Sequence, residues 1–360
     1  MTDETIAGRI TPAPPATEEI AGHRVVVAYA GAAAEDAALH QRAAVVDRSH
    51  RTRVRVGGAK AAEMVGGLVT NDTLALQPGQ GQYAAALTAK GRVVADVRIY
   101  VEAGSVLTDT GARAGAGWRA MLAKFVNPRV APHTDETAAV RALGVFGPGA
   151  RHVVEAVTGV AASALTVLPD YGHVRVASGG AALLVARTPE LGVDGFDLFV
   201  PAAEFDELWR RAVKAGAVPC GLAAWEIARV EAGRPEWGLD IDEATLAQEA
   251  NFDALQAISY TKGCYVGQEV VARVHFKGHV NRHLRGLRGG DAPGAPAGAA
   301  LFDAEGREVG DVRTSVDSPR LGPIALAMVR REIEPGAALT ARWDGGERRV
   351  EVCALPFPAP

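Results

Sequence analysis

Cysteine is scarce in this sequence, with three residues in a chain of 360. Cys220, Cys264 and Cys353 are far apart, odd in number and form no C-x-x-C pair, which argues against a disulfide framework and a structural zinc site. A protein-held iron–sulfur cluster usually draws on four thiolates, several of them closely spaced. The chain therefore lacks a cluster site of its own, no metal ligands are assigned, and at least one thiol is expected to be free.

A strong charge of one sign and long apolar runs are also absent. Lys and Arg total 38 against 42 Asp and Glu, a formal net charge of -4, so a basic nucleic-acid-binding surface is not expected. The N-terminus lacks the basic and apolar regions of a signal peptide, and no run reaches the roughly 20 apolar residues of a membrane span. We expect a cytoplasmic protein with no membrane partner. No long heptad repeat indicates an oligomer, so a monomer is expected.

The length of 360 residues exceeds a typical single domain of about 100 to 200 residues, which favours several domains or subdomains. Residues 1–24, with several prolines among small and acidic residues, are predicted to be a disordered lead. Residues 25–282 are predicted to form two α+β subdomains. Residues 283–360 are rich in glycine and proline and alternate in short strands, which is typical of a small antiparallel β-barrel.

One hairpin can be read in detail. Strands through Tyr83–Leu87 and Val93–Val101 flank a turn at Lys90 and Gly91. Period-two alternation places the apolar residues of the second strand on one face and Asp96, with its polar neighbours, on the other. Asp96 is therefore predicted to point away from the core. Further strands are predicted at 52–56, 140–146, 173–177, 182–187 and 195–200, and helices at 59–68, 118–125, 203–215 and 221–233. Hairpins without a βαβ series indicate an α+β fold.

The most unusual segment is KGCYVGQEVVAR, residues 262–273. Cys264 lies between two glycines, near Lys262 and ahead of a helix predicted to start near Gly267. A lysine and a helix N-terminus both favour a thiolate, so the segment is compatible with a reactive cysteine. On spacing alone, however, a lone cysteine in a turn is more often structural than nucleophilic, and Cys220 and Cys353 keep that interpretation.

The segment KGCYVGQE resembles the motif that defines the YgfZ folate-binding family, whose cysteine is needed for activity. Residues 68–100 and 225–273 also look like blocks of that family in the family's order, and the resemblance runs from about residue 46 to 352. The motif residues implied by the resemblance are Lys262, Gly263, Cys264, Tyr265, Gly267, Gln268, Glu269 and Arg273.

The wider superfamily is that of the glycine-cleavage T-protein, an aminomethyltransferase. The resemblance implies a ring of three subdomains, two of α+β type and a C-terminal barrel. It also implies tetrahydrofolate, or a one-carbon derivative, in the central cavity. The folate-binding residues that it implies are Asp96, Asp197, Asn71, Tyr83 and Glu231.

Three departures separate this sequence from the T-protein pattern. A tandem Asp pair is reduced to Ala95 and Asp96, and Asp197 stands where the pterin-binding glutamate is expected. Trp225 replaces an arginine, so one cationic folate contact is missing. Glu231 matches a family position, but a structural role is an equal alternative.

Two functions of different classes follow from the resemblance. The first is a tetrahydrofolate-binding accessory factor for assembly or repair of iron–sulfur proteins, with Cys264 as its working thiol and those proteins as partners. The alternative is a folate-dependent aminomethyl or methyl transferase, in which Asp96 orients the substrate amine. A third possibility is an interaction module that keeps the fold and binds no folate.

Overall fold

The computed structural model describes residues 16–178, 181–290 and 293–358. The described chain opens with a hairpin of β1 (Ala16–Ile20) and β2 (His23–Ala28), followed by helix α1 (Ala32–Gln41). The prediction of a disordered lead as far as residue 24 is therefore wrong for residues 16–24, where buried Ile20 and Val25 pack with Ala112 of a later helix. Residues 1–15 of the predicted lead lie outside the described residues.

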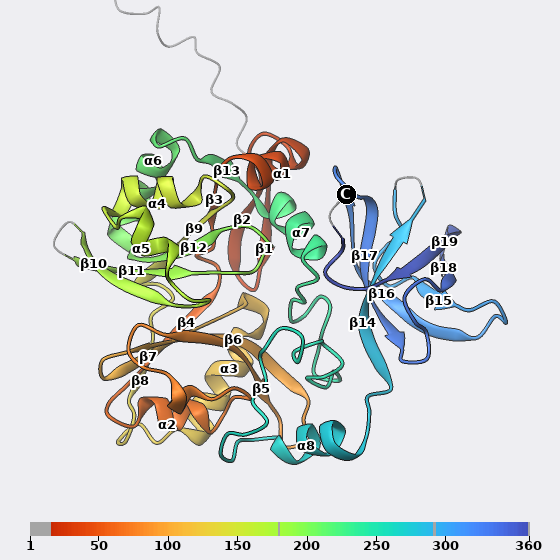
Figure 1. The fold of residues 1–360 in the computed structure, drawn as a ribbon, viewed down its shortest axis with the longest axis horizontal. Coiled ribbons are helices and arrows are strands. Elements are labelled where there is room, and N and C mark those ends of the chain that lie inside the picture. Colours follow the sequence, from red (N-terminus) through yellow and green to blue (C-terminus); the bar gives the residue numbers. More distant parts are fainter. Residues whose placement is uncertain (1–15, 179–180, 291–292, 359–360) are drawn as a thin grey trace, which may run out of the picture.

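The first subdomain is a five-stranded antiparallel sheet of order β5-β6-β7-β4-β8. Figure 1 shows helices α2 and α3 on one side of it. From Ala95 onward the apolar residues of β6 alternate as predicted, and Val97 and Ile99 join Trp118 and Leu122 of α3 in one core. The prediction is wrong for Val93, because the register shifts between Ala86 and Leu87 and Val93 packs in the core between the two sheets. Its elements are β4 (Thr52–Gly57), α2 (Ala61–Gly66), the 3-10 turn η1 (Thr73–Ala75), β5 (Gly81–Leu87), β6 (Val93–Glu102), β7 (Ser105–Thr110), α3 (Ala112–Phe125) and β8 (His133–Asp135).

The second subdomain is a six-stranded sheet of order β10-β11-β12-β9-β3-β13, antiparallel except at the β13–β3 edge. Phe196 and Leu198 of β12 pack with Val153 of α4 and Leu208 of α6, so the predicted inward face of β12 is confirmed. Its elements are β3 (Ala44–Asp47), β9 (Val140–Phe146), α4 (Ala150–Thr158), α5 (Ala162–Thr166), β10 (His173–Ser178), β11 (Ala181–Arg187), β12 (Gly195–Pro201), η2 (Ala202–Glu204), α6 (Phe205–Lys214) and β13 (Val218–Cys220).

Helix α7 (Leu222–Glu231) contacts β2, α1 and two strands of the C-terminal barrel, and Figure 1 shows it between the second sheet and that barrel. A long irregular segment then leads to α8 (Gln268–Lys277). The barrel closes in the order β14-β17-β16-β15-β18-β19. Its strands are β14 (Arg282–Gly289), β15 (Ala300–Phe302), β16 (Glu308–Ser318), β17 (Gly322–Arg330), β18 (Ala338–Trp343) and β19 (Gly346–Cys353). The predicted α+β class with a C-terminal antiparallel barrel is confirmed.

The second face of β6 is not a solvent face. Tyr100 is fully buried and packs with Tyr83 of β5 and with Leu184 and Phe199 of the second sheet. The two sheets therefore bury their facing sides against each other. Asp96 is 8% exposed, so it points away from the first core as predicted but enters a second buried layer.

Within the described residues, no helix is both long and apolar enough to span a lipid bilayer.

Candidate functional site

Strand register builds a row of polar side chains across the buried face of the first sheet. Arg53 of β4 lies opposite Asp109 of β7, Asp109 lies opposite Arg98 of β6, and Arg98 lies opposite Tyr83 of β5. Side chains of paired residues project to the same side of a sheet. Alternating charges therefore face each other along the row before any contact with the second sheet is made.

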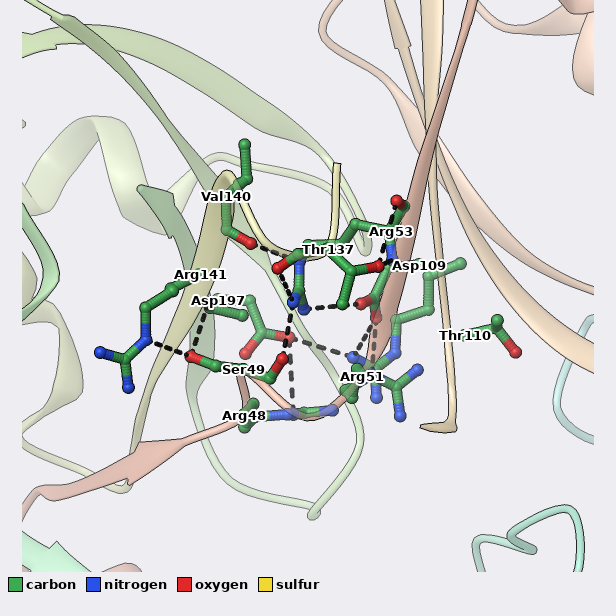
Figure 2. A network of polar contacts seen from close by, with 12 residues as sticks. Arg48, Ser49, Arg51, Arg53, Asp109, Thr110, Thr137, Val140, Arg141 and Asp197 are labelled. Atoms are coloured by element: carbon green, nitrogen blue, oxygen red, sulfur yellow. Dashed lines mark hydrogen bonds and ion pairs between the residues drawn. The ribbon is translucent and has the colours of Figure 1, made fainter. Parts of the chain in front are cut away.

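Arg98 is the centre of a buried ion-pair network. It is 3% exposed, and its Nη1 lies 3.1 Å from carboxylate oxygens of both Asp109 and Asp197, while its Nη2 contacts Glu190. Arg51 adds a bond of 2.7 Å from its Nε to Asp109. Figure 2 shows arginines and carboxylates from both sheets converging on one place. Buried charges persist only when they are paired.

Asp197 belongs to this network and not to a cavity wall. It is 1% exposed and receives a hydrogen bond of 3.1 Å from the hydroxyl of Thr188, in addition to the contact with Arg98. Arg48 approaches the same carboxylate to 3.4 Å. The space for Arg48 depends on Gly144, where an added Cβ would lie 2.9 Å from the Arg48 Cδ atom. Asp197 does not line any cavity described for this molecule, contrary to the expectation that both strand aspartates would do so.

Asp96 faces a small inner pocket of about 30 Å³. Its Oδ2 accepts a hydrogen bond of 3.2 Å from the hydroxyl of Tyr83, while its Oδ1 has no hydrogen-bond partner in the part of the chain that the structure describes. Burial raises the pKa of Asp96, although Arg51 and Arg98 oppose the rise. A buried carboxyl with one free oxygen is suited to hold or exchange a proton with a ligand amine.

A wider outer pocket of about 380 Å³ adjoins the inner one, because Tyr83 and Arg234 line both. Asn71 also lines it, with its amide donating to the backbone oxygens of Tyr83 and Gln256. The ring of Tyr83 stacks on that of Tyr171 at 6.2 Å. This volume is within the range of small-molecule sites, about 300–1,000 Å³. The structure thus brings together three of the predicted folate residues, Asn71, Tyr83 and Asp96.

Arginines lie close to Trp225, the residue at which the resemblance implies a missing cationic contact. Trp225 lines the inner pocket and a further pocket beside β2, and the guanidinium of Arg48 lies 4.0 Å from its ring. Arg51 lines the same two pockets, and its Nη2 has no hydrogen-bond partner. Sequence reasoning missed Arg48, Arg51 and Arg234. The dense basic run RSHRTRVR around the first two was the available signal.

Glu231 is not at this site. It ends α7, where its carboxylate accepts a hydrogen bond of 2.5 Å from Ser318 and contacts Arg320, both beside the barrel. The structural alternative for Glu231 is therefore the better interpretation of its contacts. Its folate-binding role has no geometric support.

Several residues of the KGCYVGQE motif make hydrogen bonds or packing contacts within the protein. The ammonium of Lys262 donates to the backbone oxygens of Gly66, Val69 and Asn71 at 2.6–2.8 Å, and burial lowers the pKa of Lys262 to about 8. These bonds tie the motif to the segment that carries Asn71. The ammonium of Lys262 is thus bound to backbone oxygens and does not pair with the Cys264 thiol as expected. Tyr265 is buried in the core between the sheets.

Gly267 precedes α8 with a φ of +88°, and an added Cβ would lie 2.6 Å from the backbone oxygen of Thr88. Only glycine permits this approach of the helix to the β5–β6 hairpin. Gln268 and Glu269 form the first turn of α8, as predicted. Gly263, Glu269 and Arg273 are exposed.

Cys264 is exposed. Unlike Lys262, Tyr265 and Gly267, it has no packing role that would explain it, and it does not line the described pockets. The thiol is thus accessible to a partner, but it does not open onto the cavity of Asp96. The other cysteines keep a structural role, and burial raises the pKa of Cys220 to about 12.

Comparisons with known proteins match nearly the whole described chain. Residues 14–259 match the model of the GCVT N-terminal domain, and residues 282–358 match that of the glycine cleavage T-protein C-terminal barrel domain. An aminomethyltransferase of Saccharopolyspora erythraea is 31% identical, over 94% of this chain and 93% of its own length. An aminomethyltransferase of Rubrobacter xylanophilus is 32% identical, over 94% and 89% of the two chains.

The same fold occurs in a solved structure, the glycine cleavage system aminomethyltransferase T from Bartonella henselae. It superposes with a TM-score of 0.86 at 24% identity, covering 96% of this chain and 94% of that one. At this identity the likeness concerns the fold alone. It confirms the predicted arrangement of two α+β subdomains and a barrel.

Proposed function

Because the chain belongs to the glycine-cleavage T-protein family, we propose that it binds tetrahydrofolate at the Asp96 pocket and transfers an aminomethyl or methyl unit there. Proteins of this family use tetrahydrofolate. The narrower likeness to YgfZ is most specific at the Cys264 motif, whereas the curated relatives that match more than nine-tenths of the chain are named aminomethyltransferases. The transferase is therefore the better-supported function.

The observation that carries the proposal is the buried carboxyl of Asp96. Its Oδ2 is fixed by Tyr83, its Oδ1 is without a partner, and its pKa is raised by burial. A group of this kind accepts a hydrogen bond from an amine N–H and passes a proton to or from that nitrogen. The amines of a reduced pterin and of an aminomethyl group both meet this requirement.

The remaining site residues have positioning roles. In this proposal the tyrosine pair Tyr83 and Tyr171 offers flat apolar surface to an aromatic ligand, and Arg234 adds a positive charge between the two pockets. The inner pocket of about 30 Å³ is the smaller of the two and has room for a small group. A one-carbon unit fits there, whereas the bulk of a folate requires the outer pocket.

The experiment is a glycine-cleavage assay with lipoylated carrier protein and tetrahydrofolate. Wild-type protein should form methylenetetrahydrofolate, and Asp96→Asn should lose about 10²- to 10⁴-fold in rate, the range of a lost acid–base group. Asp206→Asn is the control, because Asp206 is 86% exposed and lines neither the inner nor the outer pocket. No product with wild-type protein rejects the transferase.

One observation favours a second function. Cys264 is exposed, whereas the buried residues of the same motif, Tyr265 and Gly267, have packing roles. In this proposal the protein is a folate-binding accessory factor for iron–sulfur proteins. The thiolate of Cys264 exchanges disulfides with a partner protein or transiently ligates a cluster on it. The thiol's separation from the Asp96 pocket fits a surface reaction with another protein better than one-carbon chemistry.

Complementation of a strain lacking the protein tests this second function. Cys264→Ser should fold like wild type but fail to restore the activity of iron–sulfur enzymes, whereas Cys353→Ser should restore it. Full restoration by Cys264→Ser removes the cysteine from the mechanism. If Cys264→Ser fails to restore the iron–sulfur enzymes and wild-type protein shows no glycine-cleavage activity, the accessory role is better supported than the transferase.

A further inference from the structure

Two carboxylates and a histidine converge where α1 meets α7. Asp36 and His40 lie one turn apart on α1, and Glu231 ends α7. The His40 Nε2 atom is 3.4 Å from Asp36 Oδ1 and 3.2 Å from Glu231 Oε2, and the three donor atoms all lie within 4.8 Å of one another. Exposure is 1% for Asp36, 10% for His40 and 5% for Glu231.

Asp36 has no hydrogen-bond donor, although it is almost completely buried. Neither of its carboxylate oxygens has a hydrogen-bond partner among the described residues. Its neighbour Glu35 is equally buried, yet receives backbone N–H bonds from Tyr29, Ala30, Gly31 and Gly221 at 2.6–3.1 Å. A buried carboxylate without donors costs several times the net value of a hydrogen bond. Backbone N–H groups outside the helices therefore satisfy Glu35, whereas the adjacent Asp36 faces His40.

A proton on His40 answers this in part. The carboxylates of Asp36 and Glu231 raise the pKa of His40 to about 9, but Nε2 carries at most one N–H, which points along one direction. If the proton faced Glu231, Asp36 would remain without a donor. Glu231 already has Ser318 and Arg320 as partners, whereas Asp36 depends on His40 alone among the described residues.

We propose that Asp36, His40 and Glu231 bind a divalent transition-metal ion of the zinc type. Metal–ligand bonds of about 2.0–2.2 Å place tetrahedral ligand atoms about 3.3–3.6 Å apart. The two separations at His40 are close to this spacing. One imidazole with two carboxylates is a nitrogen–oxygen ligand set that suits zinc better than magnesium or calcium. Water completes the coordination.

The surroundings fit such a site. Ser318 and Arg320 hold the Glu231 carboxylate from the barrel side, as outer partners that orient a ligand. Arg320 offsets one carboxylate charge, so one negative charge is left for the ion when His40 is neutral. The ion would join α1, α7 and the barrel edge. It is independent of the folate pocket, which Glu231 does not line.

The experiment measures Zn²⁺ retained by full-length protein that has been stripped with a chelator, reloaded and gel-filtered. Wild type should retain one equivalent and gain thermal stability, whereas Asp36→Asn and His40→Gln should lose both effects. Ser318→Ala should weaken binding about 10-fold, as expected of an outer partner. His152→Gln, at an exposed histidine on α4, and Cys264→Ser, at the exposed thiol, should match wild type.

Three results would overturn the proposal. They are no Zn²⁺ retained by wild type, equal retention by Asp36→Asn and His40→Gln, or loss of retention in Cys264→Ser. If Asp36→Asn does not fold, Co²⁺-loaded wild type and His40→Gln decide. Ligand-field bands without a thiolate charge-transfer band, present only in wild type, support the site. Absence of those bands in wild type leaves a proton on His40 as the occupant and rejects the metal.

Discussion

Removal of Arg98 should destabilise the protein strongly, because this one side chain joins both sheets. Arg98→Met keeps the volume of the apolar stem but deletes the charge that contacts Asp109, Asp197 and Glu190. Breaking a buried ion pair typically costs about 3–5 kcal/mol. Asp109 keeps Arg51, and Asp197 keeps Arg48, so we expect the lower end, about 3 kcal/mol.

The assay is thermal and urea unfolding of the purified variant. At about 2–4 °C per kcal/mol, the loss corresponds to a Tm lowered by about 6–12 °C. The control is Arg119→Met, whose partner Asp135 lies 3.1 Å away in a pair that is 44% and 42% exposed. That exposed pair should contribute about 0–1 kcal/mol. If Arg98→Met is no less stable than Arg119→Met, the network does not hold the sheets together.

Three further outcomes follow from the contacts described. Gly81→Ala should lower stability by about 1–3 kcal/mol, since the new Cβ would lie 2.4 Å from the Tyr171 backbone oxygen. Gly290→Ala is its control in urea titrations, because a Cβ there meets no atom of the described residues within 4 Å. The pKa of Glu190 is held at about 2 by Arg98 and Arg48 despite burial, below the ordinary 4.5, so its contribution is complete above pH 4.5 and lost as the pH falls toward 2. Unfolding measured across that window should show the loss, and a flat profile contradicts it. Tyr83→Phe removes the hydrogen bond to Asp96 and should slow turnover about 10-fold with little effect on Tm, because the ring packing remains.

The sequence predicts the regular elements well where side-chain alternation is clean. The strand predicted at 140–146 is β9 (Val140–Phe146) with both ends correct, and the apolar face of β6 packs as expected from Ala95 onward. The burial of the opposite face of β6 is harder to predict, because Asp96, Arg98 and Tyr100 alternate with apolar residues as in a strand with one solvent-exposed face. Their burial depends on a second sheet that docks from another part of the chain, which local periodicity does not encode.

The candidate site could be predicted only in part. Asn71, Tyr83 and Asp96 are brought together as the resemblance implied. The alternation of β12 predicts the correct face for Asp197. Its ion-pair partners Arg48 and Arg98 come from distant segments, so the spacing of residues along the sequence does not predict these ion pairs. The predicted effect of Lys262 on the thiol fails for the same reason. The three backbone oxygens to which Lys262 donates lie almost 200 positions earlier in the chain.

Equilibrium titration with tetrahydrofolate shows whether the Asp96 pocket is a folate site. Wild type and the exposed-site control Asp206→Asn should bind saturably with equal affinity. Asp96→Asn should bind about 10- to 100-fold more weakly, the loss expected of a charged hydrogen bond worth about 1.5–3 kcal/mol. Absence of saturable binding by wild type, or unchanged affinity in Asp96→Asn, would contradict the account and leave a T-protein fold used for protein interaction alone.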